Sequence, residues 1–173
     1  MKIIHLVLGK ANPERMNGVN KVAFHLAKNQ HEMGHDVSVW GISNSLEHNY
    51  PARLFKTRLF RQRFNKFVLD SDLRQSIEWL PKGTVIHMHG AFIPEFYLVS
   101  RLLCAKSTPY IYTPHGSLTA AALEQSKCRK KIYFKFFEQE LIRHAAAVQL
   151  LGEQEYAHLD QLIQDVTKLL IPK

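Results

Sequence analysis

The sequence predicts an α/β fold in which a mostly parallel sheet is flanked by helices. Short, β-branched apolar runs alternate with segments of helical period along the whole chain, which is the pattern of strand–helix–strand units with right-handed crossovers. The runs are nearly continuous in apolar residues, as expected for parallel strands buried on both faces. Two of them, within residues 84–90 and 109–117, end in a histidine followed by a glycine.

The predicted elements follow one another in a regular order. The strands are expected at residues 3–8, 36–42, 84–88, 110–113, 145–151 and 168–171, and helices are expected to begin near residues 18, 94, 127 and 153. Pro94 suits the first turn of its helix, because the N–H that proline lacks has no partner there.

The first predicted helix has an apolar stripe. Val19, Val22, Ala23 and Leu26 recur at helical spacing and are expected to be the buried residues of this helix. Gly34 is expected to end the helix in the left-handed conformation, which glycine adopts without steric cost.

The segment of residues 52–80 is basic and aromatic. Between residues 53 and 66, Arg and Lys alternate with phenylalanines and leucines, and no acidic residue occurs. This pattern fits either an amphipathic helix on an acidic membrane surface or a solvated helix with one buried face. The single sign of the charge favours the membrane.

Length and composition limit the possible functions. At 173 residues the chain is expected to form one domain over residues 1–173. The net charge of +8 favours an anionic partner, such as nucleic acid, a phosphorylated substrate or an acidic membrane. Cys104 and Cys128 make no disulfide framework and have no metal-ligand spacing. Neither a membrane-spanning segment nor a secretory signal is visible, which favours a reducing, cytoplasmic setting.

Histidines occur at the ends of two predicted strands. Ligands of open α/β sheets bind beyond the carboxyl ends of the strands, so His87, His89 and His115 are expected at one crevice. His87 and His89 point to the same face of their strand, which permits metal ligation. No carboxylate or cysteine follows at close spacing, so no metal is expected. His115 is expected to be a hydrogen-bonding or acid–base group, and one of the other two a hydrogen-bonded core histidine.

Asn17, Gly18 and Val19 open the first predicted helix. Free N–H groups and the positive end of the helix dipole favour an anion there, and glycine lets the anion approach the backbone. The same residues also suit a simple turn with Asn17 as N-cap. A single glycine at this place is not the G-x-G-x-x-G fingerprint of dinucleotide-binding domains.

Four cations stand where a later helix is predicted to begin. They are Lys127, Arg129, Lys130 and Lys131. Cations at a helix N-terminus oppose the dipole, so either the helix begins later or these side chains bind something negative. The sequence contains no G-x-S-x-G nucleophile motif and no Walker A loop.

Several segments taken together resemble one known family. They are residues 17–27, 33–39, 85–90, 109–117 and 131–148. In this order they are similar to the N-terminal half of retaining glycosyltransferases of the GT-B fold and the family-4 type. The similarity covers nearly the whole chain apart from residues 43–80.

The resemblance implies the Rossmann-like N-terminal half of a GT-B fold. In this family the N-terminal domain mainly holds the acceptor, and the C-terminal domain mainly holds the nucleotide-sugar and carries an E-x7-E motif. This sequence has no E-x7-E motif and ends at Lys173. The resemblance therefore implies an acceptor-side domain without the donor-binding domain, expected to be inactive alone. A nucleotide-sugar is implied as co-substrate, with no metal and no other cofactor.

The resemblance also implies roles for individual residues. His115 is expected to be the catalytic residue, in contact with the transferred sugar near the reacting carbon. The donor diphosphate and sugar are expected to face Asn17, Gly18, Val19 and Gly116. The acceptor is expected to face His89, Gly90, Ser117, Arg129 and Lys130. Asn17 departs from the family, which usually has a glycine there.

The expected reaction is sugar transfer from a nucleotide-sugar to a glycan or lipid-linked acceptor, in the biosynthesis of cell-surface polysaccharide or lipopolysaccharide. The basic segments are expected to hold the protein peripherally on the inner face of the cytoplasmic membrane or at an anionic acceptor, and no nucleic acid is expected. One alternative is a stand-alone basic module whose aromatic residues stack on nucleic acid bases, or which binds another polyanion. A weaker alternative, an NAD-type Rossmann domain, lacks the required glycines and an acidic residue after the second strand.

Overall fold

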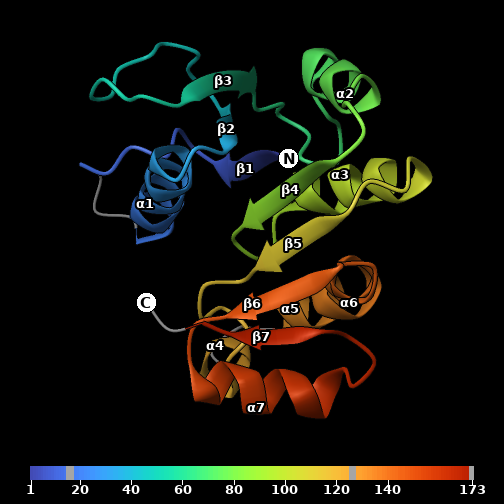
Figure 1. The fold of residues 1–173 in the computed structure, drawn as a ribbon. Coiled ribbons are helices and arrows are strands. Elements are labelled where there is room, and N and C mark those ends of the chain that lie inside the picture. Colours follow the sequence, from blue (N-terminus) through green and yellow to red (C-terminus); the bar gives the residue numbers. More distant parts are fainter. Residues whose placement is uncertain (15–17, 125–127, 172–173) are drawn as a thin grey trace.

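The computed structural model describes residues 1–14, 18–124 and 128–171. Within these ranges seven parallel strands form one sheet in the order β3-β2-β1-β4-β5-β6-β7 (Figure 1). The strands are β1 (Lys2–Leu8), β2 (Asp36–Ser43), β3 (Lys56–Arg61), β4 (Thr84–His89), β5 (Tyr110–Thr113), β6 (Ala147–Leu150) and β7 (Lys168–Leu170). The predicted fold class, a Rossmann-like α/β sheet flanked by helices, is confirmed.

The helices lie between the strands along the chain. They are α1 (Gly18–Glu32), α2 (Ser71–Glu78), α3 (Pro94–Ala105), α4 (Ala120–Glu124), α5 (Cys128–Tyr133), the π-helix η1 (Phe134–Glu138), α6 (Gln139–Arg143) and α7 (Glu153–Leu162). The helix predicted from residue 127 is therefore α5, η1 and α6 in succession. Pro94 is the first residue of α3, as predicted. No helix of the described ranges combines the length and the apolar character needed to cross a bilayer.

The central strand β1 pairs with β2 on one side and with β4 on the other. His5 of β1 lies beside Val39 of β2 and beside His87 of β4. Because all six strand pairs are parallel, the carboxyl ends of the strands meet along one edge of the sheet. The loops that follow β1, β4, β5 and β6 therefore start at the same edge, and the sequence predicted this for the loops after β4 and β5.

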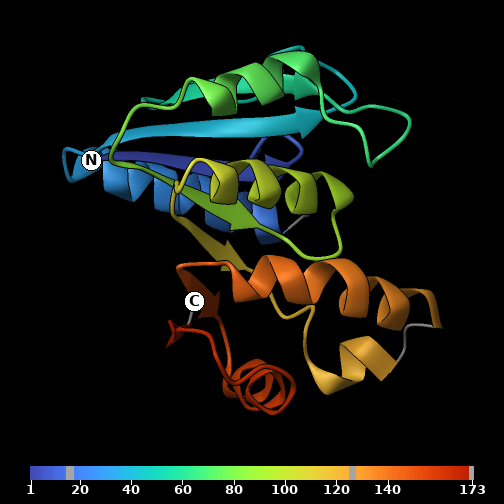
Figure 2. The same cartoon turned by 90° about the vertical axis from the view of Figure 1, so that its right-hand side faces the viewer.

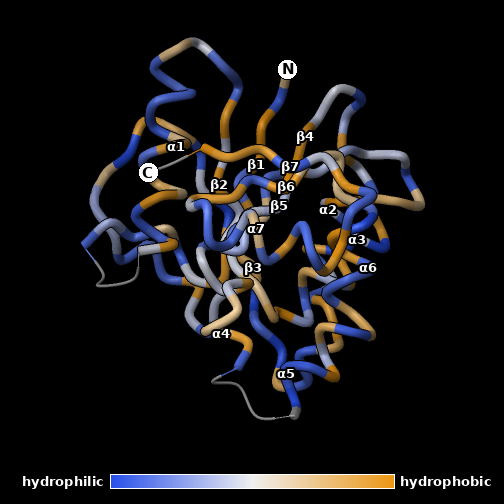
Figure 3. The backbone as a smooth tube through the Cα atoms, turned by 90° about the horizontal axis from the view of Figure 1, so that it is seen from below, coloured by the Kyte–Doolittle hydropathy of each residue, from blue (hydrophilic) through white to orange (hydrophobic). Residues whose placement is uncertain are grey.

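Helices cover both faces of the sheet. On one face α1 packs over β1 and β2, where Ala23 and Ala27 are fully buried. On the other face lie α2, α3 and α6, which Figure 2 shows stacked in front of the sheet. The larger core is on this second face and includes Tyr110, Tyr112 and Leu159 of α7. Figure 3 shows hydrophobic colour along the strands and hydrophilic colour on many of the outer loops.

The buried face of α1 differs from the prediction. The buried residues are Asn20, Ala23 and Ala27, whereas Val19, Val22 and Leu26 are only partly buried. Small side chains bring the helix close to the sheet, and the larger apolar ones lie at its flanks. The predicted end of the helix is confirmed, because Gly34 has a φ of 88°.

The prediction of a helix within residues 53–66 is wrong. Residues 56–61 form the edge strand β3, which pairs in parallel with β2. Phe60 of this strand is buried, whereas Phe64 beyond it is fully exposed. Cations on an edge strand discourage pairing with another chain, which gives a physical reason for Lys56, Arg58 and Arg61 in a strand.

Gly41 allows β2 to pass close to the loop after β1. A Cβ atom at Gly41 would lie 2.3 Å from the carbonyl oxygen of Gly9 and 2.8 Å from Cδ2 of Leu59. The tip of the Leu59 side chain can give way, but the backbone oxygen of Gly9 cannot move without shifting the loop or the strand. The close approach therefore fixes the loop that begins at the carboxyl edge.

Glu138, the last residue of the π-helix η1, is a buried carboxyl group. Its Oε1 accepts hydrogen bonds from the hydroxyl of Tyr112 and, at 3.2 Å, from the backbone N–H of Phe92. Burial raises the pKa of Glu138 to about 7, against a smaller opposing effect of these hydrogen bonds. The carboxyl group ties the π-helix to β5 and to the loop after β4.

We predict that Gly41→Ala destabilises the fold by about 2–4 kcal/mol, because overpacking against backbone forces the strand to shift. The free energy of unfolding in urea measures this effect. Gly152→Ala is the matched control, since no atom lies within 4 Å of a Cβ atom there. Equal stability of the two variants would contradict the close approach.

We predict that the native state loses stability through Glu138 as the pH rises from about 5 to about 8. The native carboxyl has a pKa of about 7 and the unfolded one about 4.5, so the native state binds more protons between these values. The stabilisation is complete below pH 4.5 and is lost as the pH rises through 7, by about 2 kcal/mol between pH 5 and pH 8. Relative to Glu138→Gln, the wild type should lose this amount in urea unfolding. The exposed Glu78→Gln should follow the wild type, and a Glu138→Gln variant with the same pH dependence as the wild type would refute the assignment.

Candidate functional site

The loop after β5 holds His115 in an unusual backbone conformation. His115 has a φ of 56° and Gly116 a φ of 82°, so two successive residues are left-handed. Such conformations are uncommon for a non-glycine residue and occur often at functional sites. The turn is closed by the N–H of Ser117, which donates to the carbonyl of Pro114 at 3.3 Å. It turns the imidazole of His115 toward β4.

A cavity of about 500 Å³ opens beside this loop. It is lined by His115, Gly116, Thr119, Leu151, Gly152, Glu153, Gln154 and Glu155. The first three residues follow β5, and the other five follow β6 and begin α7. A volume of this size suits a small ligand such as a sugar.

Helix α7 fixes the position of the loop that carries His115. Buried Glu155 accepts a hydrogen bond from the N–H of Leu118 at 3.3 Å, and Nδ1 of His158 donates to the carbonyl of Leu118 at 2.7 Å. Both backbone groups of one loop residue are therefore held by one helix. The loop after β5 and helix α7, which line the cavity from two sides, are therefore joined to each other by hydrogen bonds.

The β6–α7 residues of this cavity were missed by the sequence analysis. A signal was present, because Gly152 follows a predicted strand and precedes a helix just as Gly90 does. No histidine accompanies Gly152, and the resemblance assigned no role to this loop. The repeated glycine at strand ends was therefore the observation that could have found it.

Histidines form a hydrogen-bonded chain beneath the loops. Nε2 of His115 lies 3.1 Å from Nδ1 of His89, and Nε2 of His89 lies 2.9 Å from Nδ1 of His5. Nε2 of His5 lies 2.8 Å from Oε1 of Gln30 on α1. His5 was not expected at the site, because it lies within β1 and not at its end. The parallel register of β1 and β4 brings it there.

The three histidines of the strands are neutral at pH 7. Burial lowers the pKa of His5 to about 4, with a smaller opposing effect of the hydrogen bond to Gln30. Burial, and the neighbouring imidazoles after it, also lower the pKa values of His87 and His89 well below 6.5. His87 is a hydrogen-bonded core histidine, since its Nε2 lies 2.7 Å from the hydroxyl of Thr113.

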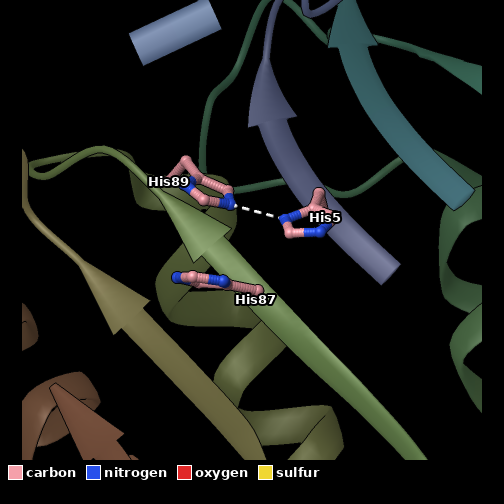
Figure 4. A group of neighbouring side chains, drawn as sticks. All are labelled: His5, His87 and His89. Carbon is pink, nitrogen blue, oxygen red and sulfur yellow. Dashed lines mark hydrogen bonds between the residues drawn. The ribbon is translucent and has the colours of Figure 1, made fainter. Parts of the chain in front are cut away.

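One group among the described residues could hold a metal ion. His5, His87 and His89 each offer a ring nitrogen, and these three atoms lie within 4.8 Å of one another (Figure 4). All three side chains are buried, and two of these imidazoles are hydrogen-bonded to each other. The absence of a metal from the function stays a prediction.

The other described site residues from β1 and β4 also lie at the carboxyl edge of the sheet, but outside the cavity beside His115. Gly18 and Val19 begin α1, after the carboxyl end of β1, and Asn17 lies outside the described residues. Gly90 follows β4, and its N–H donates to the carbonyl of Thr113 at 2.9 Å. Among the described residues of this set, Gly18, Val19 and Gly90 do not line the cavity beside His115.

The predicted acceptor residues divide into two groups. His89 and Ser117 adjoin the His115 loop, whereas Arg129 and Lys130 lie on α5. Nζ of Lys130 lies 5.3 Å from the ring centre of Phe92, in the loop after β4. The structure therefore brings Lys130 near the loop after β4, but Lys130 does not line the cavity.

Comparisons with known proteins agree with this geometry. The structure is similar to sucrose-phosphate synthase from Thermosynechococcus elongatus, with a TM-score of 0.63 and 15% sequence identity, over 99% of this chain and 48% of that chain. The chain thus spans about half the length of that protein, and at this identity the likeness concerns the fold, which corresponds to half of a GT-B glycosyltransferase. No curated protein sequence matches the chain. Glycosyltransferase Family 4 matches residues 16–165, and the chain therefore belongs to this family.

Proposed function

We propose that the chain is the acceptor-side lobe of a retaining glycosyltransferase that moves a sugar from a nucleotide-sugar to a glycan or lipid-linked acceptor. Family membership supports sugar transfer. The observation that carries the proposal is the cavity between His115–Gly116 and the start of α7, at the carboxyl edge of the sheet where ligands of open α/β folds bind. Cell-surface polysaccharide or lipopolysaccharide is the proposed product, made in the cytoplasm or at the inner face of its membrane.

Each part of the edge has a proposed role. His115 contacts the transferred sugar near the reacting carbon, held by the left-handed turn with Gly116. The N–H groups at the start of α1, around Asn17, Gly18 and Val19, face the donor diphosphate, because a helix N-terminus favours negative charge. His89, Gly90, Ser117, Arg129 and Lys130 lie on the acceptor side. These contacts need no metal.

The charge of the cavity indicates what this lobe does not supply. Its described lining contains the carboxylates of Glu153 and Glu155 and no Lys or Arg. Departure of a nucleoside diphosphate requires positive groups near the developing charge. We therefore propose that a second lobe provides the cations and most of the donor site, as it does in two-lobed enzymes of this fold.

A second surface supports contact with a membrane. Phe67, in the loop after β3, lies against α5 and η1, with ring-centre distances of 5.1 Å to Phe137 and 6.4 Å to Tyr133. Apolar side chains remain exposed around this contact, among them those of Phe64, Ile132 and Phe136. Cations adjoin them in the sequence: Arg63, which is paired with Asp70 at 3.3 Å, and Lys66, Arg129, Lys130, Lys131 and Lys135. We call these residues the aromatic–basic surface and propose that it rests on anionic lipid.

We predict that the chain of residues 1–173 binds a nucleotide-sugar weakly and transfers no sugar. Titration of UDP-glucose and GDP-mannose into ¹⁵N-labelled protein should move the amide signals of Gly116, Gly152 and Glu153, with negligible turnover by product analysis. His115→Ala should weaken this binding at least fivefold through loss of the contact to the sugar, and the exposed His144→Ala should leave it unchanged. Robust turnover of either donor by this chain alone would refute the two-lobe proposal, and shifts confined to residues away from the cavity would refute the site.

We predict that the protein floats with vesicles containing anionic lipid and dissociates in high salt. Phe64→Ser combined with Phe136→Ser should lower the bound fraction at least fivefold, since both rings are exposed and add apolar contact to the charge. Trp79→Ser is the matched control, because Trp79 is also largely exposed but lies at the end of α2. Tight, salt-sensitive binding of an oligonucleotide without vesicle binding would favour the alternative function, a nucleic acid-binding module.

A further inference from the structure

We propose that Gln30 is a positioning residue, which sets the tautomer of His115 through a relay of two buried imidazoles, His5 and His89. The inference rests on the proposed function, in which His115 contacts the sugar. It goes beyond that function because it assigns a role to residues on α1 and β1 that touch no ligand.

The relay is a continuous line of hydrogen bonds. From α1 to the cavity, the successive heavy-atom distances are 2.8 Å from Gln30 to His5, 2.9 Å from His5 to His89, and 3.1 Å from His89 to His115. His5 and His89 have exposed fractions of 0% and 1%, so water does not compete for these hydrogen bonds. His115 lines the cavity. The line therefore connects a side chain on the helix to the proposed site.

Each hydrogen bond determines the direction of the next. Oε1 of Gln30 only accepts, so Nε2 of His5 carries its proton, and Nδ1 of a neutral His5 is then an acceptor. Nε2 of His89 must donate to that acceptor, which leaves Nδ1 of His89 to accept from Nε2 of His115. Neutral His115 then carries its proton on Nε2 and its lone pair on Nδ1.

Neutral imidazoles are what make the relay directional. A protonated histidine donates from both nitrogens and would break the sequence of donor and acceptor. Burial opposes that protonation, since it lowers the pKa values of both His5 and His89. The ring of His87 lies 4.0 Å from that of His89, centre to centre, with a tilt of 32°. Its Nε2 is hydrogen-bonded to the hydroxyl of Thr113, so His87 is not part of the relay.

A metal ion bound to the strand histidines is the competing interpretation. Zinc takes the lone pair of each ligand at about 2.0–2.1 Å, so a metal ion bound at Nδ1 of His5 and Nε2 of His89 would leave these two atoms unable to hydrogen-bond to each other. In this structure those two atoms are 2.9 Å apart, which is an ordinary hydrogen-bond distance. A metal held by these two nitrogens and the relay exclude each other, and the state of the ring nitrogens separates them.

The test reads the tautomers directly by long-range ¹H–¹⁵N NMR of ¹⁵N-histidine-labelled protein at pH 7.5, treated with chelator. In the wild type, His5, His89 and His115 should all carry the proton on Nε2. In Gln30→Met the relay loses its fixed end, so a second tautomer should appear at all three histidines in the same proportion. In Gln30→Lys, where only a donor faces His5, all three should move the proton to Nδ1. Gln75→Met, an exposed glutamine on α2, is the control and should match the wild type.

Several results would overturn the relay. One is a proton on Nδ1 of His115 in the wild type. Another is a His115 tautomer that stays the same in both Gln30 variants. The third is a change of tautomer that differs among the three histidines. Stoichiometric zinc that survives purification without chelator, with metal-shifted nitrogens on His5 and His89, would assign the cluster to a metal site instead. If Gln30→Lys does not fold, Gln30→Met still decides the question. No ligand is needed, so failure of the relay is distinct from failure of sugar binding.

Discussion

The parallel pairing of β1 with β4, and of β4 with β5, is the constraint on which the site depends. It places the ends of strands that are far apart in sequence along one edge, so that His89, Gly90 and His115 meet although 26 residues separate the two histidines. It also fixes the register in which His5 lies beside His87. If either pair shifted by one residue, the histidines would move to the opposite face of the sheet. The grouping of these histidines thus follows from the register of β1, β4 and β5.

Burying so many polar side chains on one face of a sheet carries a condition. A buried imidazole needs hydrogen-bond partners, because the free-energy cost of burying it without them exceeds the stabilisation that its packing contributes. His5, His87 and His89 meet the condition through Gln30, Thr113 and one another. Such a network has few satisfactory arrangements, so it restricts the rotation of every ring in it. The rigidity that a positioned His115 requires follows from the cost of leaving any of these groups unpaired.

Most of the framework could be predicted from the sequence, because apolar runs of strand length and glycines at their ends are local signals. The strand ends at Gly90 and Gly116 were found in this way. The strand β3 was not found. An edge strand buries few side chains, and a sequence of alternating cations and apolar residues is equally compatible with a surface helix. His5 was not found either, because nothing local distinguishes a histidine within β1 from one that fills the core. Its role depends on the register with β4, which no local pattern contains.

The distribution of charge gives the two sides of the lobe different tasks under the proposed function. The described lining of the cavity beside His115 has two glutamates and no Lys or Arg, whereas cations and exposed apolar side chains occur together on the loop after β3 and on α5 and η1. Positive charge placed in the cavity would bind a diphosphate tightly in the ground state, which does not by itself favour its departure. Placed on the outer surface, the same charge attracts an anionic membrane without competing for the donor. An excess of cations outside and none in the described cavity is therefore what a lobe needs if it presents an acceptor and takes the donor's countercharge from elsewhere.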